Sequence, residues 1–337
     1  QMFIDCSNFN QPVNFDTSSV TMMHYMFRSC SNFDQSVNFD TSSVTNMSRM
    51  FAYCSDFNQP VNFDTSSVTT MNRMFESCFD FNQPVNFDTS QVTNMHQMFI
   101  DCSNFNQPVN FDTSKVTTMS YMFGSCSAFN QPINWDTSQV TNMSLLFAYC
   151  SNFNSSVTFT DTSKVTTMAG MFSVCSVFNQ PVSFDTSSVT DMLQMFQRCS
   201  EFNQPLDFDT SSVTNMYQMF RNCPMFDQNI RSWNVSSSAT LTDMFSGATD
   251  MISRYSGVSG FGNVGNNYTP TYTFFNLIPQ TPLVNGSGQH GIKSVVEQWI
   301  IDPSQAIFSS LNDPNYGLIA DWDTSQVTDM SELFLNN

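Results

Sequence analysis

Apolar and polar residues recur in one fixed order along most of the chain. In residues 61–63, Val-Asn-Phe, apolar side chains alternate with a polar one, and this alternation predicts a short strand. In residues 68–78 the apolar side chains recur at i, i+3, i+6, i+7 and i+10, which places them on one face of a predicted short helix. Residues 64–66, Asp-Thr-Ser, lie between the two segments and are predicted to cap that helix.

This order repeats with a period that the cysteines mark. Successive cysteines are 24 residues apart, with one step of 25 where Thr160 is inserted. Such a period is typical of a solenoid, in which a repeat cannot bury its apolar side chains alone and buries them by stacking on its neighbours. We therefore predict an α/β repeat solenoid with one short parallel strand and one short helix per repeat. The cysteines are Cys6, Cys30, Cys54, Cys78, Cys102, Cys126, Cys150, Cys175, Cys199 and Cys223.

The repeated order also resembles a known family. Met-Phe-x-x-Cys-x-x-Phe, a short strand and Asp-Thr-Ser-x-Val-Thr-x-Met follow one another as in the BspA-like leucine-rich-repeat surface proteins of bacteria and microbial eukaryotes, here in a 24-residue variant. The resemblance covers residues 1–245 and again 321–334. It implies a leucine-rich-repeat-like, right-handed rod that is extracellular or displayed at the cell surface.

The regular repeat stops before the end of the chain, and segments of different composition follow. Residues 1–245 are predicted to form the solenoid. Residues 246–289 are rich in Gly, Thr, Asn and Pro, and are predicted to be an ordered cap or a linker. Residues 290–320 show helical spacing and are predicted to form a helical cap, whereas residues 321–337 begin a further repeat.

The charge balance excludes two classes of partner. The chain contains 28 Asp and Glu but only 10 Lys and Arg, which gives a net charge of −18. Binding to nucleic acid or to anionic lipid is driven by basic patches, so neither is an expected partner. No apolar run approaches the ~20 residues of a membrane span. No leader sequence is recognised, and the chain opens within a repeat, which favours an excised part of a longer chain.

The cysteines allow two interpretations. Each occupies the same core position of its repeat, so its neighbours are copies related by a straight translation. Their Cβ atoms then point the same way, which is poor geometry for a disulfide. A buried column of free thiols is the favoured interpretation, and disulfides between adjacent repeats are the alternative.

One aspartate per repeat lies at the predicted start of the helix. A carboxylate there caps free N–H groups, and this is the favoured interpretation. Carboxylates one repeat apart are also close enough to share a hard cation, so Ca²⁺ is the one cofactor considered. The column consists of Asp16, Asp40, Asp64, Asp88, Asp112, Asp136, Asp161, Asp185 and Asp209.

One asparagine per repeat lies at the middle of the predicted strand, on its outward side. Stacked amides can hydrogen-bond along such a column, which is a structural role. A polar, uncharged face is also what a glycan or a surface protein would contact. The column consists of Asn14, Asn38, Asn62, Asn86, Asn110 and Asn134, and in the next three repeats the equivalent residues are Thr158, Ser183 and Asp207.

Glycosylation is a further prediction. The chain contains six Asn-x-Ser/Thr sequons, which accept N-linked sugar in secreted proteins. The threonine and serine columns, such as those that begin at Thr17 and Thr21, would accept O-linked sugar if they point outward. The sequon asparagines are Asn46, Asn142, Asn154, Asn234, Asn267 and Asn285.

No catalytic motif stands out. The only histidines are His24, His96 and His290, and no Ser or Cys nucleophile is paired with a base in a recognisable motif, so an enzyme is not predicted. We expect an extracellular structural protein, a subunit of a surface layer, an appendage or a head-to-tail fibre that is joined through residues 1–30 and 292–337. The alternative is an adhesin-like module that binds a glycan or a protein through the asparagine face.

Overall fold

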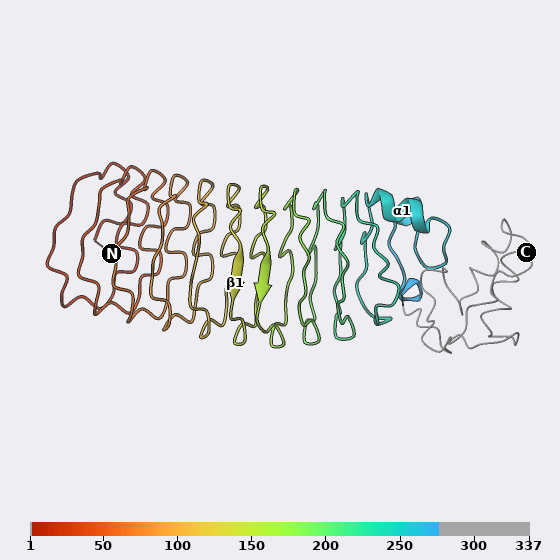
Figure 1. Ribbon diagram of the computed structural model, residues 1–337. Coiled ribbons are helices and arrows are strands. Elements are labelled where there is room, and N and C mark those ends of the chain that lie inside the picture. The colour runs from red at the N-terminus through yellow and green to blue at the C-terminus, as the bar shows by residue number, and fades with distance from the viewer. Residues whose placement is uncertain (1, 276–337) are drawn as a thin grey trace, which may run out of the picture.

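The repeats stack side by side into an elongated rod. The computed structural model describes residues 2–275, and Figure 1 shows the successive repeats following one another along a single axis, from the N-terminal end to a cap that contains helix α1. The predicted solenoid is therefore present. No helix among residues 2–275 is long and apolar enough to cross a membrane.

The predicted strand is formed in two repeats. Strand β1 (Ile133–Trp135) pairs in parallel with strand β2 (Val157–Phe159), and each residue of β1 lies opposite its copy in the next repeat. In the other described repeats the triplet is extended chain outside any assigned strand. It keeps the alternation of buried, exposed and buried side chains except in the first repeat, where Val13 is half-buried and Phe15 is exposed. The alternation predicted the direction of the side chains correctly and overestimated the backbone pairing.

The additional residue of the one long repeat follows β2. The Thr160 N–H donates to the Trp135 carbonyl at 3.0 Å, so the extra residue is bonded to the preceding repeat. The register between repeats is restored after the insertion. The Thr166 N–H donates to the Thr141 carbonyl at 2.9 Å, like its counterparts elsewhere in the array.

The helix predicted in each repeat is wrong. Residues 71–78 form a run of tight turns, in which the Met74 N–H donates to the Met71 carbonyl at 3.1 Å. Arg73, inside this turn, has a φ of 57°, which lies in the left-handed region and outside a right-handed helix.

The N–H groups that a helix would bond internally bond to the next repeat instead. The Arg73 N–H donates to the His96 carbonyl at 3.0 Å, and the Phe75 N–H donates to the Met98 carbonyl at 2.9 Å. Successive tight turns bring every third residue back to the same side, as a helix does approximately. The five apolar side chains of residues 68–78 are consequently all buried, as predicted.

The core consists of columns of identical side chains. Phe75 is fully buried, and its ring stacks on Phe51 at 5.7 Å and on Phe99 at 5.5 Å between centroids. Within the same repeat it also stacks on Phe81 at 4.3 Å. Stacked rings add to the energy of burial, so each repeat is stabilised mainly by its two neighbours.

The cysteines form a column of free thiols, as the favoured interpretation predicted. All ten are free, and all except Cys6 are buried. The Cys78 thiol donates to the Phe51 carbonyl of the preceding repeat at 3.0 Å, and the other buried thiols do the same. Burial raises the pKa of Cys30 to about 11 and that of Cys223 to about 12.

A small cap covers the last repeat. It contains helix α1 (Thr249–Tyr255) and the 3₁₀ segments η1 (Val264–Asn266) and η2 (Tyr272–Phe274). Phe261 of the cap stacks on Phe245 of the array at 5.2 Å between centroids. Residues 246–275 therefore pack against the array, whereas residues 276–289, the predicted helical cap at 290–320 and the predicted repeat at 321–337 lie outside the described residues.

Candidate interaction surfaces

The aspartate column forms caps, although each one caps a tight turn. One Asp64 carboxylate oxygen accepts hydrogen bonds from the Ser66 N–H at 3.1 Å and from the Ser66 hydroxyl at 2.7 Å. These bonds stabilise the ionised carboxylate and hold the pKa of Asp64 below its ordinary value, the hydroxyl contributing most. The serine two residues later also lowers the pKa at five aspartates through its hydroxyl first, and at Asp161 through its N–H first; the five are Asp16, Asp40, Asp88, Asp112 and Asp209.

The calcium site remains a prediction. Within residues 2–275, no three or more His, Cys, Asp or Glu side chains gather in an arrangement that would hold a metal ion. The column supplies one carboxylate per repeat, and capping already engages one oxygen of each carboxylate described above. Ca²⁺ takes six to eight oxygen ligands, so the column alone would leave most of its coordination to water.

The threonine that follows each aspartate is a contact that the sequence reasoning missed. The Thr65 hydroxyl is 1% exposed and donates to the Asp88 carbonyl of the next repeat at 2.9 Å. This column is therefore buried, so it does not meet the condition on which O-linked sugar was predicted. The same bond is made by Thr17, Thr41, Thr89, Thr113, Thr137, Thr162, Thr186 and Thr210.

The second threonine column does lie at the surface. Thr69 is exposed, its N–H donates to the Thr45 carbonyl at 2.9 Å, and its hydroxyl lies 3.2 Å from the same carbonyl. This column begins at Thr21 and is exposed in all nine repeats that carry it. Here O-glycosylation remains a prediction.

The asparagine face is exposed, but its amides do not form the predicted ladder. All six asparagines from Asn14 to Asn134 are exposed, and in the described part of the chain no hydrogen bond joins one of them to the next. The ladder is built four residues earlier in the repeat, where the Asn58 side chain accepts from the Asn82 N–H and from the Gln83 amide, each at 3.0 Å. Free amides are therefore available on the face, and its role in binding remains a prediction.

The sequons differ in accessibility. Asn46 and Asn142 are half-buried, and their side chains accept hydrogen bonds from the serine two residues later. Three sequon asparagines are exposed, Asn154, Asn234 and Asn267, and Asn285 lies outside the described residues. Glycosylation remains a prediction, and the exposed three are the best candidates.

One histidine lies beside a serine of the next repeat. His96 Nδ1 is 2.7 Å from the Ser120 hydroxyl and 3.1 Å from the Ser120 carbonyl, and burial lowers the pKa of His96. Ser120 is itself buried, so this contact links two repeats inside the wall. His290 lies outside the described residues.

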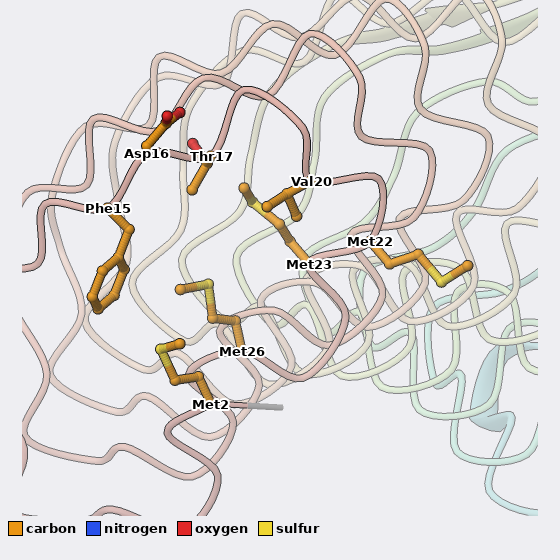
Figure 2. A pocket seen from close by; sticks show the side chains of 8 residues that line it. All are labelled: Met2, Phe15, Asp16, Thr17, Val20, Met22, Met23 and Met26. Carbon is orange, nitrogen blue, oxygen red and sulfur yellow. The ribbon is translucent and has the colours of Figure 1, made fainter.

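An apolar cavity of about 450 Å³ lies at the first repeat. Figure 2 shows Met2 beside Met26, Met23 above them beside Val20, and Phe15 to their left, with Asp16 at the upper left. Met2 is 63% exposed and Met22, which also lines the cavity, is 60% exposed. The cavity falls within residues 1–30, where the sequence predicts a contact between chains.

The repeats match one family model. The family is described as "Mycoplasma protein of unknown function, DUF285", and its model matches residues 1–86, 84–159, 155–258 and 301–337, more than half of the chain. The chain belongs to this family. The match fits the repeat protein that the sequence resembled. No curated protein matches the chain.

Several solved leucine-rich repeat proteins are distantly similar to this DUF285 chain. One from Eubacterium ventriosum shares 18% identity over 49% of this chain and 43% of its own, less than half its length, at a TM-score of 0.36. One from Bacteroides ovatus shares 15% identity over 75% of this chain and 82% of its own, at a TM-score of 0.26. A leucine rich cell surface protein from Faecalibacterium prausnitzii shares 15% identity over 67% of this chain and 73% of its own, at a TM-score of 0.36.

In this DUF285 chain four positions within the tight turns vary strongly between repeats. We define the variable face as the positions equivalent to Asn72, Arg73, Glu76 and Ser77, all within the tight turns. Across nine repeats these four positions hold six, five, seven and six residue types, whereas Asp, Thr and Ser at residues 64–66 are identical in all nine. The sequence reasoning missed this face because it followed the residues that repeat.

Proposed function

We propose that this chain is an extracellular structural repeat protein, a rod that serves as a subunit of a surface layer, appendage or fibre. The observation that carries this proposal is the continuity of the bonds between repeats. Each repeat is joined to the next by four sets of contacts: the hydroxyl bonds of the Thr17 column, the Asn58-type amide ladder, the hydrogen bonds of the buried thiols and the phenylalanine stacks.

Such continuity suits a protein that spans distance. Each repeat contacts only its neighbours, so the length of the rod grows with the number of repeats without any change in the contacts. The strongly acidic composition favours solubility of an extended surface. The location at the cell surface is part of the proposal and rests on the resemblance to surface proteins.

We propose head-to-tail joining as the route from rod to fibre. The cavity at Met2, Met22 and Met26 is an apolar surface at one end, and residues 292–337, outside the described part, are the predicted complement. A contact between two different ends of identical chains does not close on itself, and therefore produces a filament.

Negative-stain electron microscopy with analytical ultracentrifugation tests this function. The wild-type chain is expected to form filaments in which rods are joined end to end, and Met22→Glu is expected to prevent them. Val264→Glu is the matched control, because Val264 is an equally apolar residue, 78% exposed, in the cap. A monodisperse wild-type monomer at high concentration would overturn the fibre.

A second candidate function is a binding module, favoured by the free amides of the asparagine face. The six exposed asparagines present the same group once per repeat, which matches a ligand that is itself repetitive, such as a glycan chain. A glycan array is expected to show binding that is lost when Asn62, Asn86 and Asn110 are replaced by Ala. Absence of binding by the wild-type chain to every glycan would remove this candidate.

A further inference from the structure

We propose that the variable face carries a lateral contact between rods, in which a cluster of arginines and tyrosines binds the aspartate column of a second copy of this chain. This inference rests on the proposed structural function and adds the sideways contact that a layer or bundle requires. The Arg–Tyr cluster comprises Tyr25, Arg28, Arg49, Tyr53 and Arg73.

Exposure alone does not explain why this face varies. The column that begins at Thr21 is exposed in all nine repeats and is threonine in all nine. The six asparagines from Asn14 to Asn134 are also exposed and identical. Most positions of the variable face are half-buried or buried. The members of the Arg–Tyr cluster are half-buried except Tyr53, which is exposed, so part of each of these side chains is accessible to a partner.

The backbone conformation of the variable face is unfavourable for residues that carry a side chain. Two of its four positions have positive φ in every repeat, a conformation that favours glycine. Only one of these eighteen positions is glycine, Gly170, and the β-branched Val174 occupies another with a φ of 63°. Large side chains are thus retained where glycine would fit the backbone best, which indicates that they are used.

The residue types on this face are those that dominate protein interfaces. Five of the ten Lys and Arg of the chain lie there, namely Arg28, Arg49, Arg73, Arg198 and Arg221. Five of the nine tyrosines lie there too, namely Tyr25, Tyr53, Tyr121, Tyr149 and Tyr217. Tyrosine and arginine are enriched among the residues that contribute most to binding between proteins.

Contacts between repeats hold the Arg–Tyr cluster in place. The Arg49 guanidinium donates to the Tyr25 hydroxyl at 2.7 Å and lies 5.4 Å from the centre of the Tyr25 ring. The Arg28 guanidinium lies 5.8 Å from the centre of the Tyr53 ring. Because these side chains are already ordered by their neighbours, less conformational entropy is lost when a partner binds.

The cluster is positive on an otherwise acidic molecule. It contains three guanidinium groups, and within residues 2–275 the carboxylate that pairs with it is Glu76, 3.8 Å from Arg49 Nε and 4.0 Å from Arg73 Nε. The chain as a whole carries a net charge of −18. A second copy therefore offers abundant carboxylates, and opposite charge would direct them to this cluster.

The aspartate column is the complementary surface by spacing and by charge. Arg49 and Arg73 occupy the same position of successive repeats, so they share the interval of the aspartates, which recur once per repeat of the same solenoid. Arg28 lies in the preceding repeat, three residues after the equivalent position. The charges beside Asp64 are Asp40 and Asp88, which repel it, so a guanidinium from another rod would relieve this repulsion. Arginine binds carboxylates with two parallel hydrogen bonds.

Sedimentation equilibrium at low and high salt tests this contact. The variants are built in a Met22→Glu background, in which head-to-tail joining is blocked and lateral association is seen alone. Lateral association is expected at about 50 mM salt and is expected to weaken strongly at about 500 mM, because salt screens the charges. Replacing Arg28, Arg49 and Arg73 with Gln is expected to weaken association about tenfold or more.

Two further variants make the test specific. Arg198→Gln with Arg221→Gln is the matched control, because these arginines lie on the same face outside the cluster, and association should be retained. Asp40→Asn, Asp64→Asn and Asp88→Asn together keep a capping side chain but remove the charge, and should weaken association as the arginine variant does. Circular dichroism checks that each variant is folded.

Mixing the two weakened variants gives the decisive result. The arginine variant retains an intact aspartate column and the aspartate variant retains an intact cluster, so the mixture is expected to associate again. Failure of the mixture to associate, association that is unchanged by the triple arginine variant, or a Met22→Glu chain that stays monomeric at low salt would each overturn the lateral contact. None of these outcomes affects the filaments of the wild-type chain, which test the head-to-tail function separately.

Discussion

Removal of one buried hydroxyl tests whether the Thr17 column holds the repeats together. In Thr65→Val the side-chain shape is nearly unchanged, but the donor to the Asp88 carbonyl, 2.9 Å away, is lost. The site is 1% exposed, so water does not replace the hydroxyl. The Asp88 carbonyl, however, belongs to an exposed residue and the bond is only partly buried, so we expect a loss of stability of about 0.5–1.5 kcal/mol, the range of a typical hydrogen bond.

The matched control is Thr69→Val, four residues away. Thr69 is exposed, its hydroxyl bond to the Thr45 carbonyl is long at 3.2 Å, and the Thr69 N–H already occupies that carbonyl. Water can compensate for the lost group, so the expected cost is below about 0.5 kcal/mol.

Hydrogen exchange measured by mass spectrometry, together with guanidinium unfolding, is the assay. Because each repeat contacts only its neighbours, Thr65→Val should speed exchange in the repeats that contain residues 65 and 88, and much less in distant repeats. Equal effects of the two variants, or a uniform change along the whole rod, would refute the role of the buried column.

Three further predictions follow from the core and the caps. In the native chain only Cys6 should react with a thiol reagent at pH 8, because burial raises the pKa of the other thiols. All ten cysteines should react after unfolding, and fewer than ten reactive thiols would indicate disulfides. Phe123→Ala should cost about 3–5 kcal/mol in guanidinium unfolding, whereas Phe79→Ala, at a half-exposed ring, should cost much less. Asp64 and the six other capping aspartates named above with it have a pKa below the ordinary 3.8, so their contribution to stability is complete above that value and is lost as the pH falls through the lowered pKa. Circular dichroism should show unfolding in acid, with no loss between about pH 5 and 7.

The sequence predicted burial better than backbone conformation. The spacing of Val68, Met71 and Cys78 identified side chains that share one side, and all are buried. A helix and a run of tight turns both bring every third residue to the same side. The difference depends on whether the N–H of a residue such as Arg73 bonds within its own repeat or to the next, and that requires the neighbouring repeat to be in place.

The polar columns were harder to assign for a related reason. Asp64 was correctly predicted to cap, because its hydrogen bonds are made two residues away in the same repeat. Thr65 and Asn58 bond to groups in the following repeat, and nothing local distinguishes them from Thr69 and Asn62, which are exposed. Contacts across repeats are therefore visible in the structure and not in the spacing of one repeat.

The extra residue at Thr160 shows how accurately each repeat must be copied. The insertion follows β2, is bonded to the preceding repeat, and leaves the later contacts with their usual partners. The rod therefore demands a fixed set of bonding positions but tolerates a longer path between them. For a gene that grows by duplication, this means that a copying error at this corner is harmless, and for a protein engineer it marks a place where a peptide can be inserted into the wall without interrupting the stack.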